Sequence, residues 1–205
     1  MGLLLSILAE RKAHYDKDKQ EWLGYCNMNQ LVYFDIGFDT GVPMRRVVVE
    51  LKSSYSKSLS EMFVKIARGE FVHPAYGRKI EYTGTVLHHI SSSKNLIMGG
   101  DVLYKNGCGG CAPVCNKVFQ ENNLLSNVQN TRGKLVLLPS DSNPTLFSSI
   151  FYILLDSSTS PSIVDGCVIG DVIEGIDTLD EIVKEYGSEN GIPGKRLTIH
   201  KCGHL

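Results

Sequence analysis

The sequence lacks the long apolar runs and the one-sided charge that mark membrane proteins and nucleic-acid-binding proteins. A membrane-spanning helix needs about 20 mostly apolar residues in a row, and the 205 residues contain no such run. The apolar residues 3–9 are too few for a signal-peptide core and have no basic lead. With 21 basic and 22 acidic residues, the formal net charge is −1. We therefore expect an intracellular protein, cytoplasmic or nuclear, without a nucleic-acid partner.

Cysteine is also scarce, because six cysteines in this length do not make a disulfide scaffold. Three of them, Cys108, Cys111 and Cys115, lie in one short stretch. Thiolates at this spacing can bind zinc if a histidine supplies the fourth ligand, and a Cys-x-x-Cys pair can act in redox chemistry. The sequence has no second Cys-x-x-Cys pair. We therefore favour ordinary thiols over either alternative and expect no cofactor.

Residues 1–29 predict an N-terminal helical extension. Nothing between Gly2 and Gly24 breaks a helix, but residues 11–20 are polar, so this helix needs a surface on which to pack. It can pack on the following domain, make an oligomer or partner contact, or remain a frayed tail. Gly2 and Ser6 fit the N-myristoylation pattern, although one acyl chain gives only marginal membrane binding. We divide the chain into this extension and a domain of residues 30–205.

The rest of the chain has a mostly β pattern. Short β-branched and aromatic runs predict strands over residues 31–36, 46–51, 84–89, 95–98, 134–138, 150–155, 166–172 and 196–201. Helical spacing of apolar residues predicts helices over residues 58–68 and 176–186, which end at Gly69 and Gly187. Ser58 and Glu61 have the spacing of a capping box, which predicts that the first of these helices begins there. Many short strands with two helices indicate one β-rich domain.

Several stretches together resemble one known family. Tyr82-Thr-Gly-Thr-Val-Leu-His-His-Ile90, followed by Met98-Gly-Gly-Asp101, is similar to the cyclophilin pattern Tyr-x-Gly-x-x-Phe-His-Arg-Ile and Gln-Gly-Gly-Asp. Further similar stretches follow in the family's order at residues 32–36, 46–51, 106–110, 119–124, 168–177 and 199–205. The resemblance covers residues 31–205. It implies a mainly β fold, a cyclophilin-like closed eight-stranded antiparallel barrel capped by two helices, here with the N-terminal helical extension added.

The resemblance implies an activity, the cis/trans isomerisation of X-Pro bonds, whose uncatalysed rotation is slow. An arginine, always charged, stabilises the twisted amide in the family. Counting from Tyr82 places His89 at this arginine position, whereas counting back from Gly99 places Ile90 there. The glutamine that supports the arginine corresponds to Met98, and a second polar partner corresponds to Ile150. A histidine can donate a hydrogen bond, but it is mostly neutral at pH 7.

The peptide groove implied by the resemblance is changed as well. Asn95 replaces a phenylalanine in its apolar floor, Leu96 replaces a methionine, and Tyr152 keeps an aromatic body where the family has phenylalanine. Ser140 and Asp141 correspond to the Ala-Asn pair that binds the extended substrate. The remaining groove positions are Ile163 and Val164. Ile163 replaces the tryptophan used in cyclosporin binding, so we expect poor cyclosporin binding.

The losses around His89, Met98 and Ile150 belong together, because supporting amides are dispensable once the catalytic charge is gone. We therefore expect a peptide- or protein-binding module with lost or strongly reduced isomerase activity, acting as an interaction or scaffold subunit. Its partner would be a protein or an extended peptide, including proline-containing ones. Two alternatives stay open: an active but atypical isomerase, and an oligomer or membrane adaptor driven by residues 1–29.

Overall fold

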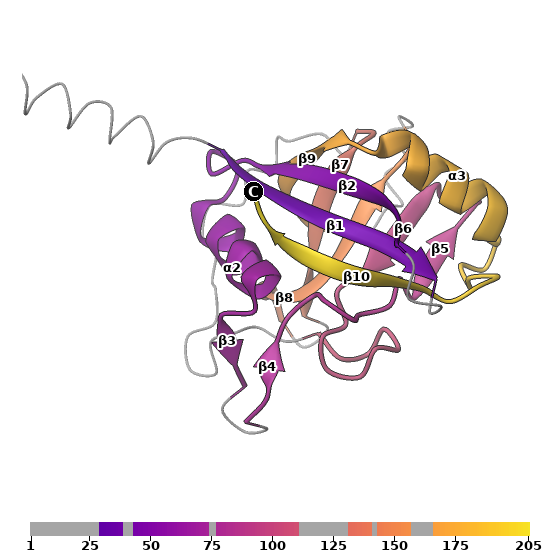
Figure 1. Cartoon of the computed structure of the whole chain (residues 1–205). Coiled ribbons are helices and arrows are strands. Elements are labelled where there is room, and N and C mark those ends of the chain that lie inside the picture. Colours follow the sequence, from indigo (N-terminus) through magenta and orange to yellow (C-terminus); the bar gives the residue numbers. More distant parts are fainter. Residues whose placement is uncertain (1–28, 39–42, 74–76, 111–130, 141–142, 157–165) are drawn as a thin grey trace, which may run out of the picture.

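The computed structural model describes residues 29–38, 43–73, 77–110, 131–140, 143–156 and 166–205 (Figure 1). The predicted N-terminal helix therefore lies outside the described residues, as do Cys111 and Cys115 and the groove positions Asp141, Ile163 and Val164. No helix in the described ranges is long and apolar enough to cross a membrane.

Eight antiparallel strands form one curled sheet. Their order across the sheet is β10 (Leu197–His204), β1 (Gln30–Phe38), β2 (Pro43–Leu51), β9 (Cys167–Glu174), β7 (Lys134–Ser140), β8 (Asn143–Leu154), β6 (Leu96–Gly99) and β5 (His89–Ser91). Every pair in this order is antiparallel. The predicted mainly β fold with eight antiparallel strands is confirmed.

Hydrogen bonds between the segment before β5 and the opposite edge strand close this sheet into a barrel. The backbone N–H of Leu87 donates to the carbonyl of Leu197 at 2.9 Å, and the N–H of Ile199 donates to the carbonyl of Thr85 at 2.9 Å. Val86 lies opposite Thr198 between these two bonds. These contacts pair part of one edge of the sheet with part of the other, so these backbone groups need no further strand.

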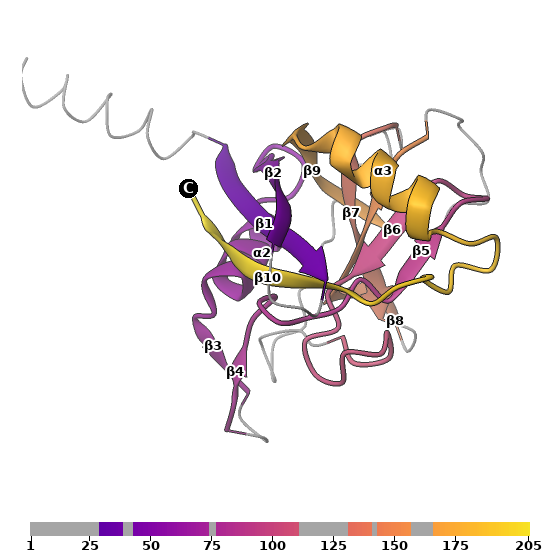
Figure 2. The same cartoon turned by 45° about the vertical axis from the view of Figure 1, so that its right-hand side comes forward.

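The helix α2 (Lys57–Arg68) covers one end of the barrel, and α3 (Ile176–Tyr186) lies at the other (Figures 1 and 2). The predicted bounds of α3 are confirmed. The predicted capping box of α2 is wrong, because the N-cap is Ser56, whose Oγ accepts the N–H of Leu59 at 3.2 Å. Ser58 already lies within the helix. Gly69 ends α2 in the left-handed conformation, with φ of 62°.

Aromatic rings fill the space between α2 and the inner face of the sheet. Phe63 of α2 lies 4.8 Å from the ring centroid of Tyr82 and 5.7 Å from that of Phe151. Phe34 of β1 stacks on Phe151 at 5.6 Å. The Tyr82 side chain is fully buried, and its hydroxyl donates to the carbonyl of Ser149 at 3.2 Å. A large aromatic core of this kind anchors both the helix and the central strands.

Three differences between the predicted and the observed elements are the largest. The strand predicted over residues 84–89 is mostly the closing segment, and β5 itself begins only at His89. The strand β8 begins at Asn143, seven residues before the predicted start at 150. A short hairpin, β3 (Phe71–Val72) and β4 (Lys79–Ile80), was not predicted, because strands of two residues have no readable alternation.

The cap of α2 yields a first prediction. Replacing Ser56 with alanine removes the side-chain acceptor of the Leu59 N–H and should lower the free energy of unfolding by about 1 kcal/mol. The matched control is Ser60→Ala on the same helix, since the buried Ser60 hydroxyl has no hydrogen-bond partner among the described residues. That control should leave stability unchanged or raise it. Urea denaturation measures both, and equal losses would contradict the assigned cap.

Candidate peptide-binding site

The strand register places five side chains in one line across the sheet, which we call the His89 row. His89 pairs with Met98, Met98 with Tyr152, Tyr152 with Val136, and Val136 with Val168. Directly paired residues of neighbouring strands share one face of a sheet. Of the two alignments considered, this register places His89, and not Ile90, opposite Met98.

The face that carries the His89 row is apolar. A second hydrophobic cluster, separate from the main core, is built there from Leu96, Val136, Tyr152, Leu154 and Val168. The side chains of Tyr55, Met98 and Leu138 are partly buried and pack against it. Tyr152 has no exposed surface. The structure thus brings together the predicted site residues His89, Leu96, Met98 and Tyr152, and it adds Val136 and Val168, which were not predicted as site residues.

His89 lies at the edge of this face, against the connection between α3 and β10. The connection runs beside β5 (Figure 2), where the N–H of Ile90 donates to the carbonyl of Gly191 at 2.9 Å. The His89 ring lies directly over Gly191, because an added β-carbon there would be only 1.8 Å from His89 Cε1. Burial lowers the pKa of His89 below its ordinary value, and the charge of Lys94 lowers it further. The ring is therefore mainly neutral at pH 7.

Two other predicted positions have different surroundings. Ile150 is buried, and an added β-carbon at Gly110 would lie 2.7 Å from its Cγ1, so the chain around Gly110 packs on it. Asn95 is exposed in the β5–β6 turn with φ of 45°. Asparagine suits this left-handed turn position, and the assignment of Asn95 to an apolar floor stays a prediction. The Asn95 carbonyl accepts the N–H of Leu155 at 2.8 Å.

For the remaining predicted positions the structure describes few contacts. Ser140 ends β7 opposite Asn143, while its neighbour Asp141 lies outside the described residues together with Ile163 and Val164. Cys108 is an exposed free thiol. The other two cysteines of that stretch, Cys111 and Cys115, are also outside the described residues, so the zinc and redox alternatives stay predictions.

Asp101, which follows the two glycines after β6, organises the next loop. Its Oδ1 accepts the backbone N–H groups of Leu103 and Tyr104, and its Oδ2 accepts those of Asn106 and Gly107, at 2.6–3.1 Å. The residue is fully buried. Burial alone would raise the pKa of Asp101, but these N–H groups lower it to about 2. Asp101 is therefore a charged structural anchor of residues 101–107.

His88 packs on this anchored loop. Its ring covers Gly107, since an added β-carbon there would lie 2.8 Å from His88 Cδ2. Burial lowers the pKa of His88, while the carboxylate of Asp101 acts in the opposite direction. The Nδ1 atom is buried and has no hydrogen-bond partner in the part of the chain that the structure describes.

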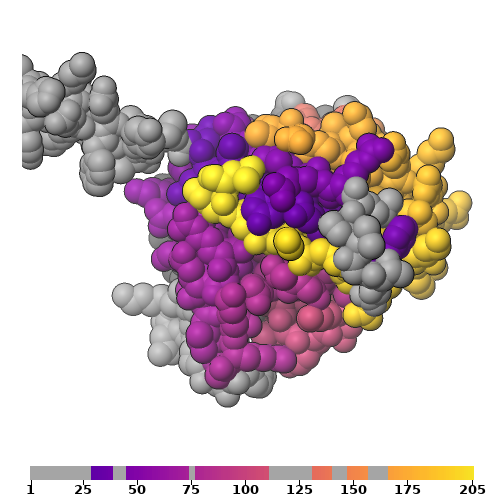
Figure 3. Space-filling view, in the orientation of Figure 1, coloured from indigo at the N-terminus to yellow at the C-terminus, as the bar shows by residue number. Residues whose placement is uncertain are grey.

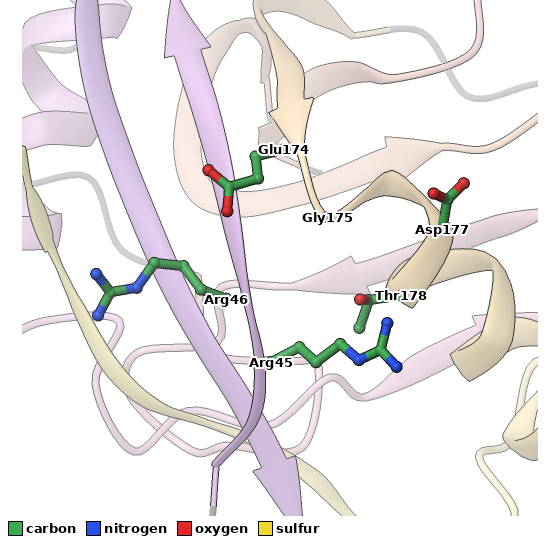
Figure 4. A pocket seen from close by; sticks show the side chains of 6 residues that line it. All are labelled: Arg45, Arg46, Glu174, Gly175, Asp177 and Thr178. Atoms are coloured by element: carbon green, nitrogen blue, oxygen red, sulfur yellow. The ribbon is translucent and has the colours of Figure 1, made fainter.

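A pocket of about 340 Å³ lies away from the His89 row, where β2 meets the start of α3 (Figure 4). Arg45 and Arg46 line it together with Glu174, Gly175, Asp177 and Thr178. Arg46 donates two hydrogen bonds to Asp35, at 2.7 and 2.9 Å, and lies over the Tyr33 ring. Arg45 faces Glu181 at 3.9 Å. Because both guanidinium groups have carboxylate partners, we assign this pocket no ligand.

The closed eight-stranded antiparallel barrel with a helix at each end defines the general class of the protein. The sequence model of the family described as cyclophilin type peptidyl-prolyl cis-trans isomerase/CLD matches residues 33–204. This match begins within β1 and ends with the last residue of β10, so it takes in the whole barrel. The chain belongs to this cyclophilin-type family.

The contact between His89 and Gly191 yields a second prediction. Gly191 has φ of 80°, so Gly191→Ala introduces both backbone strain and a collision with the His89 ring. We expect it to lower the free energy of unfolding by about 2 kcal/mol. In a His89→Ala background the collision is absent, and the cost should fall to about 1 kcal/mol. Urea denaturation of the four proteins measures this cycle, and an equal cost in both backgrounds would refute the contact.

The carboxylate of Asp101 yields a prediction on pH. Its folded pKa of about 2 is below the ordinary value of 3.8, so its contribution to stability is present above pH 3.8 and is lost as the pH falls towards 2. Asp101→Asn should be about 3 kcal/mol less stable at pH 7, because an amide presents N–H groups to N–H donors. The stability of Asp101→Asn should also fall less between pH 3.8 and pH 2, because this variant has no carboxylate at position 101 to protonate.

Denaturant midpoints between pH 2 and pH 7 test the role of Asp101. Glu61→Gln, which changes an exposed carboxylate on α2, is the control and should follow the unmodified protein. The role is disproved if Asp101→Asn has the same acid-induced decline as the unmodified chain.

Proposed function

We propose that this protein is a cyclophilin-like peptide-binding module with lost or strongly reduced isomerase activity, which acts as an interaction subunit. Its partner is a protein or an extended peptide that docks on the face of the His89 row. Met98 and Leu138 offer partly exposed apolar surface there, and His89 offers one hydrogen-bond donor. Residues 1–29 form a separate extension in this proposal, since β1 begins at Gln30.

The observation that carries this proposal is the pairing of His89 with Met98. Prolyl isomerisation is promoted in this family by a permanently charged guanidinium, and His89 is mainly neutral because burial lowers its pKa. A thioether is only a weak acceptor and cannot orient a donor as an amide does. Ile150 is buried beside Gly110 and is likewise without a polar side-chain group. These features support an apolar binding face and not a charged catalytic one.

The proposal is tested by measuring cis/trans exchange of an X-Pro peptide by NMR with the full chain. We expect no measurable catalysis by the unmodified protein and none by His89→Arg, because Met98 and Ile150 leave the guanidinium unsupported. The triple variant His89→Arg/Met98→Gln/Ile150→Gln restores the family's side chains and should raise the exchange rate at least tenfold above that of His89→Arg.

Two results would overturn this proposal. One is a substantial rate in the unmodified protein that His89→Ala abolishes, which would make the protein an active isomerase with a histidine donor. The other is the absence of peptide-induced amide shifts along the His89 row in the same NMR samples, which would remove the binding site. Circular dichroism of each variant verifies that the barrel is intact.

A further inference from the structure

A pocket of about 250 Å³ lies next to the His89 row, where three separate segments meet. The closing segment before β5 contributes residues 86–88, and the loop anchored by Asp101 contributes Lys105 and Asn106. The end of the α3–β10 connection contributes Pro193, Lys195 and Arg196. In the space-filling view, the rose surface of the segment after β6 borders the yellow surface of the C-terminal segment (Figure 3). We call this hollow the basic pocket.

The charged groups that line the basic pocket are all cationic. Lys105, Lys195 and Arg196 contribute three positive charges, and no carboxylate of the described residues lines the pocket. Lys105 and Lys195 form no ion pair with any carboxylate of the described ranges. A concave site lined by one sign of charge concentrates the electrostatic potential and attracts the opposite sign. The pocket is thus complementary to an anionic group.

The neighbouring groups hold Lys105 and Lys195 in place without forming an ion pair with either of them. The Lys195 ammonium lies 5.2 Å from the ring centroid of Phe38 and 5.5 Å from that of Tyr186, and such cation–π contacts fix its position. Lys105 belongs to the loop that Asp101 anchors. The Asp101 carboxylate acts on His88 electrostatically, but both of its oxygens already accept backbone N–H groups. It is therefore not available as an ion-pair partner.

Exposed apolar side chains directly precede two of the lining residues in the sequence and indicate the kind of ligand. Tyr104, which precedes Lys105, is 57% exposed, and Ile192, which precedes Pro193, is 68% exposed. These are two of the five large hydrophobic side chains that are exposed in the described ranges. Free phosphate would make no use of such a rim, whereas a peptide contacts both apolar and charged groups.

We propose that the basic pocket binds an acidic side chain, a glutamate or a phosphorylated serine, of a peptide partner whose flanking apolar residue packs on Tyr104 and Ile192. Lys105 and Lys195 donate charge-assisted hydrogen bonds to the anionic oxygens. This site is distinct from the His89 row, although His88 lines the pocket and the next residue begins the row. Binding there needs no proline in the partner.

The experiment uses NMR titration of the full chain with proline-free peptides that carry leucine beside phosphoserine, glutamate or glutamine. The phosphoserine and glutamate peptides should shift the backbone amides of Lys105, Asn106, Lys195 and Arg196, and the glutamine peptide should bind about tenfold more weakly. Lys105→Gln/Lys195→Gln should weaken the two acidic peptides about tenfold. The control Lys57→Gln/Lys65→Gln changes the same charge on exposed positions of α2 and should leave affinity unchanged.

Each other outcome overturns the proposal. Equal binding of the glutamine peptide removes the role of the anion, and an equal loss in the control variant reduces the effect to net charge. Inorganic phosphate that binds as tightly as the phosphoserine peptide removes the role of the apolar rim. The absence of shifts at the pocket removes the site itself. Because the peptides lack proline, none of these outcomes depends on isomerase activity or on binding at the His89 row.

Discussion

The closure of the barrel between residues 85–87 and β10 is the constraint on which the other features depend. Two backbone hydrogen bonds at 2.9 Å join segments that lie more than a hundred residues apart in the sequence. They bring His88 to the end of the α3–β10 connection and set His89 over Gly191. Without this closure the basic pocket would not exist, since it combines residues from the two edges of the sheet, and His89 would not lie against Gly191.

The two candidate sites differ in the charge of the side chains that form them. The His89 row is apolar, and its histidine is kept mainly neutral by burial. The basic pocket, one residue earlier in the chain, holds lysines that lack described carboxylate partners. A charge is costly to bury but is retained easily at a solvent-facing hollow. The proposed binding functions thus differ: apolar peptide contact at the row, and recognition of an anion at the pocket.

The sequence predicted the barrel because many short motifs follow the order of the family. It also predicted His89, Met98 and Tyr152 as site residues. It failed where local patterns compete. Both Ser56 and Ser58 can cap a helix, and only the backbone conformation of Ser56 decides between them. Alignment assigned Asn95 to a pocket floor and did not predict its left-handed turn conformation. Val136 and Val168 were not predicted as site residues, because cross-strand neighbours are set by register.

The sequence by itself determined the family, the predominance of antiparallel strands, the bounds of α3 and the absence of arginine at either candidate position. These follow from local periodicity and from motifs that survive in order. Only the tertiary structure decided that His89 faces Met98, that its ring covers Gly191, and that Lys105 and Lys195 share one hollow. The physical reason is that barrel closure and strand register are non-local: they depend on hydrogen bonds between distant segments, which no single stretch of sequence encodes.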